Sequence, residues 1–122
     1  MKVTKVAHVS LNVQGNLDET RRFYHEVLGL GDVPRPDIPG VAGHWHALGD
    51  TQLHLIDAPH AGHGIDTRGP HFCVFVDDLD AAIAELDDRG IAHRDGAQGD
   101  VRQVWINDPA GSTIELQQDP LV

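Results

Sequence analysis

Three histidines and one glutamate stand at matching places in two halves of the sequence. His8 lies in VAHVSLNV, and His71 lies 63 positions later in the similar segment GPHFCVFV. His54 lies in LHLI, and Glu115 lies 61 positions later in IELQ. Imidazole nitrogens and a carboxylate oxygen together suit a divalent first-row transition metal. The four residues therefore predict a metal site, for which we expect Zn²⁺, Ni²⁺, Mn²⁺ or Fe²⁺.

The repeat extends to the elements that position these residues. In each half an alternating, strand-like segment precedes a helical one and then two further strand-like segments. These segments cover residues 6–13, 17–30, 44–48 and 51–56 in the first half, and 69–76, 79–91, 102–106 and 112–117 in the second. We expect two modules of strand, helix and two or three strands, at about 1–57 and 69–122, joined by a Gly- and His-rich linker at about 58–68 within a single domain spanning 1–122.

Residues that favour helix ends mark the two helical segments. Asp78 is a candidate N-cap for the second helix, and Gly90 is its expected C-terminal stop. Gly29 takes the corresponding place after the first helix.

Strand alternation predicts which face carries the four candidate ligands. Successive side chains point to opposite faces, and the apolar set must pack under the helix. Because Val9 and Leu11 belong to that set, His8 faces away from the helix, and the same reasoning applies to the other three. We expect the four on the concave face of a curved sheet. The expected pocket beside them is lined by Trp45, Gln52, Cys73, Gln103 and Trp105.

The other histidines have simpler interpretations. Alternate residues of one strand, His44 and His46, are expected to be solvated or to line the pocket rather than to bind metal. We expect surface positions for His25 and His93, and no role for the linker residues His60 and His63.

Charge and composition exclude several kinds of partner. The chain has 122 residues, with 9 Lys and Arg against 19 Asp and Glu, and a formal net charge of −10. Such a surface repels nucleic acid and anionic membranes. No apolar run approaches the roughly 20 residues that span a bilayer. The single cysteine, Cys73, fits a reducing cytoplasm.

The chain resembles the vicinal oxygen chelate superfamily, which includes glyoxalase I, extradiol dioxygenases and the fosfomycin and bleomycin resistance proteins. The resemblance rests on residues 6–13, on RFYHEVLGL at 22–30 and on NDPAGSTIEL at 107–116. It implies an α+β fold of two βαβββ modules forming a cupped mixed sheet. It also implies metal ligands at His8, His54, His71 and Glu115, and a homodimer in which the first two belong to one chain and the last two to the other.

The function implied by the resemblance is that of a divalent-metal enzyme. Its small substrate would chelate the metal through vicinal oxygens, in a lyase or isomerase reaction or in ring cleavage by a dioxygenase, with Glu115 as the catalytic proton shuttle. Glyoxalase I has a carboxylate where this chain has His54, and extradiol dioxygenases have a tyrosine where it has Trp105. The chain thus resembles uncharacterised glyoxalase-like members. The alternatives are a protein of the bleomycin resistance type that sequesters a drug or toxin, and a metal-stabilised dimer without activity.

Overall fold

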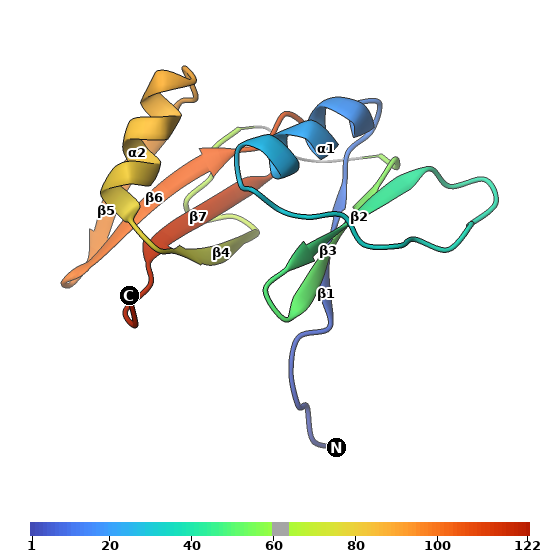
Figure 1. Cartoon of the computed structure of the whole chain (residues 1–122), viewed down its shortest axis with the longest axis horizontal. Helices are drawn as coiled ribbons and strands as arrows, with labels where there is room; N and C mark the ends of the chain where they lie inside the picture. Colours follow the sequence, from blue (N-terminus) through green and yellow to red (C-terminus); the bar gives the residue numbers. More distant parts are fainter. Residues whose placement is uncertain (60–63) are drawn as a thin grey trace. The chain divides into compact units, whose positions relative to one another are not determined.

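The computed structural model describes residues 1–59 and 64–122 (Figure 1). Its internal contacts divide the chain into two compact units, Met1–Ala61 and Gly62–Val122. The boundary between the two units falls within the linker predicted at about 58–68. His60 and His63, of which we expected no role, lie outside the described residues.

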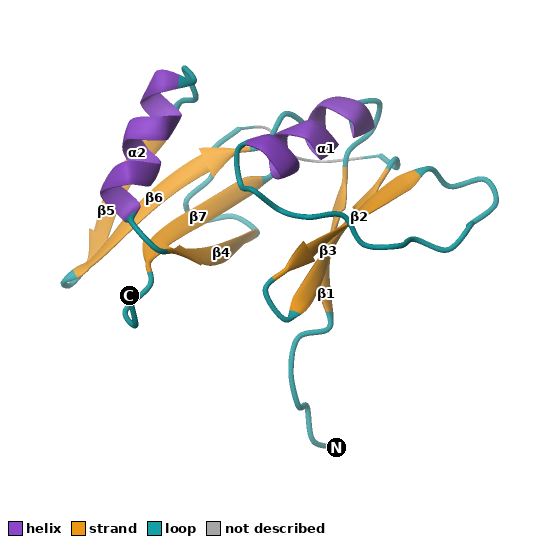
Figure 2. Ribbon diagram, in the orientation of Figure 1, coloured by secondary structure: helices purple, strands orange, loops and turns teal. Residues whose placement is uncertain are grey.

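The first unit contains β1 (His8–Asn12), α1 (Leu17–Glu26), β2 (Gly43–Leu48) and β3 (Thr51–Ile56). Its sheet has the order β1-β3-β2, with β1 parallel and β2 antiparallel to β3 (Figure 2). The register places Ser10 of β1 and Trp45 of β2 opposite His54 of β3. One face of this small sheet therefore collects side chains from all three strands around His54.

A fourth strand, between α1 and β2 in the chain, is reduced to a single bridge in the first unit. Asp32 forms an isolated bridge with His46. Two backbone hydrogen bonds flank it, from the Ala47 N–H to the Gly31 carbonyl at 2.8 Å and from the Val33 N–H to the Trp45 carbonyl at 3.0 Å. The first unit thus holds this edge of its sheet with very few backbone contacts.

The second unit has the full set of strands. It contains β4 (His71–Val76), α2 (Leu79–Asp88), β5 (His93–Gln98), β6 (Val101–Asn107) and β7 (Thr113–Gln118). Its sheet has the order β4-β7-β6-β5, with β4 parallel to β7. Strand β5 was not among the expected strands, because its sequence HRDGAQ is polar and largely exposed and so carries no apolar alternation.

The helix ends largely confirm the capping predictions. The Asp78 carboxylate accepts a hydrogen bond from the Ala81 N–H at 2.9 Å, as an N-cap does. Gly90 follows α2 with a φ of 68°, a conformation that favours glycine. Each helix has 10 residues, and among the residues that the structure describes no helix is long and apolar enough to cross a membrane.

Each unit buries the apolar side chains between its helix and its sheet. The apolar residues that are at most 3% exposed are Val13, Tyr24, Leu53 and Leu55 in the first unit, and Leu79, Leu86, Val104, Ile106, Ile114 and Leu116 in the second. In β3 and β7 these core residues alternate with His54 and Glu115. Packing of the core therefore fixes which face carries the candidate ligands.

His93, the first residue of β5, contacts one aspartate of α2 and one of β5 in the second unit. These contacts predict that its contribution to stability depends on pH. Its ring contacts Asp87 Oδ1 at 2.8 Å and Asp95 Oδ1 at 2.7 Å. Hydrogen bonds to Asp87 first and Asp95 second raise the pKa of His93 above 6.5. Protonated His93 therefore stabilises the folded state fully at pH values below the pKa of histidine in the unfolded chain. This stabilisation declines as the pH rises through the raised pKa of the folded state.

We expect His93→Gln to lower the free energy of unfolding by about 0.5–1 kcal/mol in mild acid, because the aspartates are more than half exposed. Urea unfolding at about pH 6 and about pH 9 measures the difference, which should shrink at the higher pH. An equal difference at both pH values would contradict this assignment.

Candidate metal centre

His71 and Glu115 lie together on the helix-free face of the second unit. His71 Nε2 is 3.3 Å from Glu115 Oε2, and the Glu115 side chain is only 5% exposed. The other oxygen, Oε1, accepts hydrogen bonds from the side-chain amides of Gln103 and Gln117, each at 2.8 Å. A buried carboxylate needs such partners. Two donors therefore hold Oε1 and leave Oε2 directed towards His71.

The hydrogen bond on the far side of His71 determines which nitrogen faces Glu115. His71 Nδ1 donates to the Gly69 carbonyl at 2.9 Å. In the neutral ring Nε2 then carries a lone pair. A lone pair and a carboxylate oxygen 3.3 Å apart repel each other unless a proton or a cation lies between them. This donor set, with its supporting carbonyl and amides, fits a divalent metal.

The predicted pocket residues Trp105 and Cys73 adjoin this pair. The Trp105 ring packs edge-on against His71, with centroids 4.8 Å apart. Cys73 is the register partner of Glu115. Desolvation of the thiol, and secondly the Glu115 carboxylate, raise the pKa of Cys73 from 9.0 to about 11. The thiol is therefore protonated at neutral pH and is not an activated nucleophile.

In the first unit, His54 lies in the middle of a stack of three rings. Its ring is parallel to Trp45, with centroids 3.8 Å apart, and stacks on His8 at 4.1 Å. His54 Nε2 is 2.9 Å from Gln52 Oε1, so this nitrogen donates and leaves Nδ1 with the lone pair. Burial, and secondly the proximity of His8, lower the pKa of His54 below 6.5. The stack thus fixes the orientation of a neutral imidazole.

Within each unit the structure brings together the residues that alternation predicted. His8, His54, Trp45 and Gln52 meet in the first unit, and His71, Glu115, Cys73, Gln103 and Trp105 meet in the second. The amide of Gln117, which holds Glu115 as Gln103 does, was not predicted. Gln117 could have been predicted to contact Glu115, because residues two apart in a strand lie on the same face.

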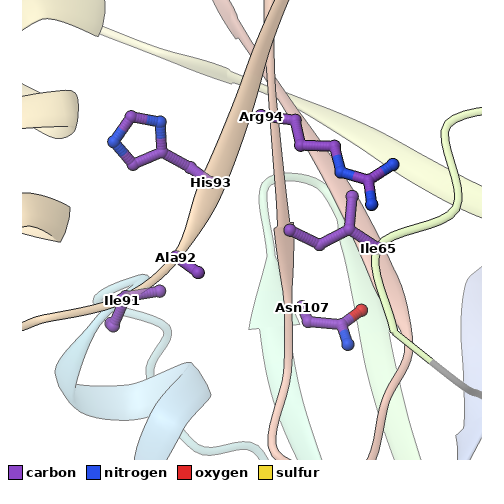
Figure 3. A pocket seen from close by; sticks show the side chains of 6 residues that line it. All are labelled: Ile65, Ile91, Ala92, His93, Arg94 and Asn107. Carbon is purple, nitrogen blue, oxygen red and sulfur yellow. The ribbon is translucent and has the colours of Figure 1, made fainter.

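A separate pocket opens beside the first residues of β5 (Figure 3). Its volume is about 410 Å³, and its lining consists of Ile65, Ile91, Ala92, His93, Arg94 and Asn107. In Figure 3, Arg94 and His93 extend from opposite sides of the strand. None of the predicted ligands lines this pocket, so the candidate centre does not depend on it.

Sequence reasoning missed a cluster on the helix-covered face of the first unit. Asp32, His44 and His46 place one ligand atom each within 4.8 Å of the others. His46 is fully buried, so of the two settings expected for it, solvated or pocket-lining, the solvated one is wrong. Burial, and secondly His44, lower the pKa of His46, and the hydrogen bond from His44 lowers the pKa of Asp32. The sequence of β2, GHWHAL, contains no pattern that predicts this burial.

The Gln103 amide supports a prediction about the second-unit pair. Gln103→Leu removes one donor from Glu115 and keeps the apolar stem. We expect affinity for a divalent metal to fall about 10–100-fold, the usual effect of losing a residue that orients a ligand. Competition with a chromophoric chelator measures the change, with Gln98→Leu on β5 as the exposed glutamine control. Equal affinities in the two variants would contradict this role for Gln103.

Comparison with known proteins gives matches along nearly the whole chain. The family model Glyoxalase/Bleomycin resistance protein/Dioxygenase superfamily matches residues 5–116. A glyoxalase family protein from Bacillus anthracis is 25% identical, with a TM-score of 0.84 and 98% of each chain covered. TnmS3, an antibiotic binding protein from Streptomyces sp. CB03234, is 26% identical, with a TM-score of 0.77 and coverage of 97% of this chain and 98% of that chain. Glyoxylase I 4 of Arabidopsis thaliana is 27% identical in an alignment 130 positions long, which covers 95% of this chain and 71% of that protein. These matches confirm the predicted fold class.

Proposed function

We propose that this chain is a metal-dependent enzyme acting on a small molecule, on the premise that it belongs to the glyoxalase/bleomycin resistance protein/dioxygenase superfamily. The observation that carries the proposal is the pairing of His71 Nε2 with Glu115 Oε2 at 3.3 Å. The second supporting observation is the oriented, neutral ring of His54 beside His8. In the proposal these four residues hold one Zn²⁺, Ni²⁺, Mn²⁺ or Fe²⁺ ion.

The proposed reaction uses Glu115 to move a proton. When bound, the metal supplies Lewis-acid polarisation of a substrate that chelates it through adjacent oxygens. When it is not bound to the metal, Glu115 Oε2 would take a proton from the carbon next to the substrate carbonyl and return it in a lyase or isomerase reaction. Gln103 and Gln117 keep the carboxylate oriented through Oε1. Trp45 and Trp105 cover the neighbouring rings and limit the access of water to the site.

The first experiment combines metal analysis with proton exchange. At this centre we expect near one equivalent of a transition metal per chain, measured by elemental analysis. The metal-loaded protein should then catalyse deuterium incorporation from D₂O into a small 2-hydroxyketone, followed by NMR, and Glu115→Gln should lose this exchange. Iron together with oxygen consumption on a catechol would instead assign the ring-cleaving reaction. A protein that takes up none of the four metals on titration would overturn the proposal.

A sequestering function is the second candidate. It is supported by the similarity to TnmS3, an antibiotic binding protein. Aromatic side chains on the same faces as the candidate ligands, Trp45 and Trp105, suit a flat organic ligand. Stoichiometric binding of such a ligand, unchanged by metal removal and without product, would favour this candidate over the enzyme.

The proposal includes a homodimer in which His8 and His54 of one chain share a site with His71 and Glu115 of the other. Mixed dimers of His8→Ala and His71→Ala would then contain one intact site, while the second site lacks two ligands. We expect co-refolding of the two variants to raise the metal bound at the shared sites from near none to roughly one quarter of the wild-type value. Refolding each variant alone is the control, and no rise on mixing would contradict shared sites.

A further inference from the structure

We propose that Asp32, His44 and His46 form a second binding site for a divalent transition metal of the Zn²⁺ class, separate from the candidate centre. The carboxylate of Asp32, Nε2 of His44 and Nδ1 of His46 would supply three ligands, and water would complete the coordination. The ion would fasten the segment around Asp32 to β2. Its role is to stabilise the edge of the first unit.

The geometry of the cluster matches the size of such a site. His44 Nε2 is 2.8 Å from Asp32 Oδ1, and His46 Nδ1 is 3.4 Å from the same oxygen. Ligand atoms around a tetrahedral zinc ion lie about 3.3 Å apart. The His44 ring donates its proton to Asp32 at present. A metal would replace that proton, as metals do at histidine ligands, and the ligand atoms, which all lie within 4.8 Å of one another, would draw together around it.

The buried ring of His46 is the independent observation that points to a ligand. Its side chain is 0% exposed, and neither ring nitrogen has a hydrogen-bond partner among residues 1–59 and 64–122. The Gly31 carbonyl, which also accepts from the Ala47 N–H, approaches the His46 ring but forms no hydrogen bond of normal geometry with it. Buried polar groups are almost always satisfied, because an unpartnered one costs about 1–3 kcal/mol. A metal ion at Nδ1 would supply the missing partner.

The second unit shows which side chains occupy the positions equivalent to His44 and His46. Trp45 pairs with His54, as Trp105 pairs with Glu115, so His44 and His46 correspond to the buried Val104 and Ile106. Asp32 bridges to His46 as His93 of β5 pairs with Ile106. The first unit thus has two histidines in place of core side chains, and a carboxylate beside them. Within residues 1–59, the first unit also lacks a strand that pairs with β2 as β5 pairs with β6. A bound metal would hold this edge of the sheet in place of those backbone hydrogen bonds.

The cluster is distinct from the candidate metal centre of the first unit. His44 and His46 alternate with Trp45 along β2, and Trp45 stacks on His54. Successive residues of a strand point to opposite faces. His46 also packs near Tyr24 of α1, with ring centroids 6.1 Å apart. The cluster therefore belongs to the helix-covered face, whereas His8 and His54 lie on the other face.

Metal titration of designed variants tests the inference. Asp32→Asn and His44→Gln are the test variants, because the Asp32 side chain is 61% exposed and His44 is outside the fully buried core. Chelator-treated full-length protein is titrated with Zn²⁺ against a chromophoric chelator, and with Co²⁺ by its visible absorption. Each variant is made alone and together with His71→Ala. His25→Gln is the matched control, because His25 is a nearby histidine outside the cluster.

We expect two equivalents of Zn²⁺ in the wild type, one in Asp32→Asn or His44→Gln, one in His71→Ala and none in the combined variants. His25→Gln should keep both. If wild type and His71→Ala each bind one equivalent and Asp32→Asn binds none, the inference stands and the proposed catalytic site fails. If Asp32→Asn and His44→Gln bind as much Zn²⁺ as the wild type, or if His25→Gln loses an equivalent, the inference is overturned.

Discussion

Replacing His71 with alanine is expected to remove the metal of the candidate centre and, with it, the proposed proton exchange. The change deletes the nitrogen that lies 3.3 Å from Glu115 Oε2. It also leaves that buried carboxylate facing no cation. Because loss of a residue that merely orients a ligand costs about 10–100-fold in affinity, loss of the ligand itself should cost more than about 100-fold. Chelator competition and deuterium exchange measure the two effects.

The control for this experiment is His93→Gln, which changes another histidine of the same unit. His93 contacts Asp87 and Asp95 and lies apart from Glu115. Its metal affinity should equal that of the wild type within experimental error. Full affinity in His71→Ala, with normal circular dichroism, would show that the pair does not hold the metal.

Replacing Ile114 with alanine is expected to lower the free energy of unfolding by about 2–5 kcal/mol. Ile114 is 0% exposed and pairs with Phe72 of β4 and Ile106 of β6. The loss combines the transfer free energy of the deleted methyl groups with the cavity that remains. Because Ile114 precedes Glu115 in β7, the same cavity loosens the strand that carries the candidate ligand. Urea denaturation followed by tryptophan fluorescence measures the change.

Val101→Ala is the matched control, since Val101 is a 46% exposed aliphatic residue at the start of β6. Exposed substitutions of this kind usually change stability by less than about 0.5 kcal/mol. A similar small loss in Ile114→Ala would mean that the core of the second unit does not depend on this side chain.

The sequence was sufficient to predict the two modules and the face of each candidate ligand. The physical reason is that apolar residues on β3 and β7 must meet the helix, so strand alternation sends His54 and Glu115 to the other side. Asp78 was predictable because a helix N-terminus needs a side-chain acceptor. Helix capping and the alternation of apolar residues along a strand are therefore sufficient to predict all of these features.

Two features were not predictable, because each depends on contacts distant in the sequence. The polar strand β5 forms through its ladder with β6, and not through any apolar pattern of its own. The burial of His46 follows from its packing under α1 and beside Asp32. A single strand sequence cannot reveal either contact. The role of the four candidate ligands in binding a metal stays a prediction, which His71→Ala tests directly.

The parallel pairing of the first and last strands in each unit determines the order in which the chain can fold during synthesis. β1 pairs only with β3, and β4 pairs only with β7, among the strands of the described residues. Neither sheet can close until its last strand has left the ribosome, and units of a chain generally fold N-terminal first. The histidine pair of the first unit would thus form while β7 is still being translated. A nascent chain would present His8 and His54 to cellular metal before His71 and Glu115 have met.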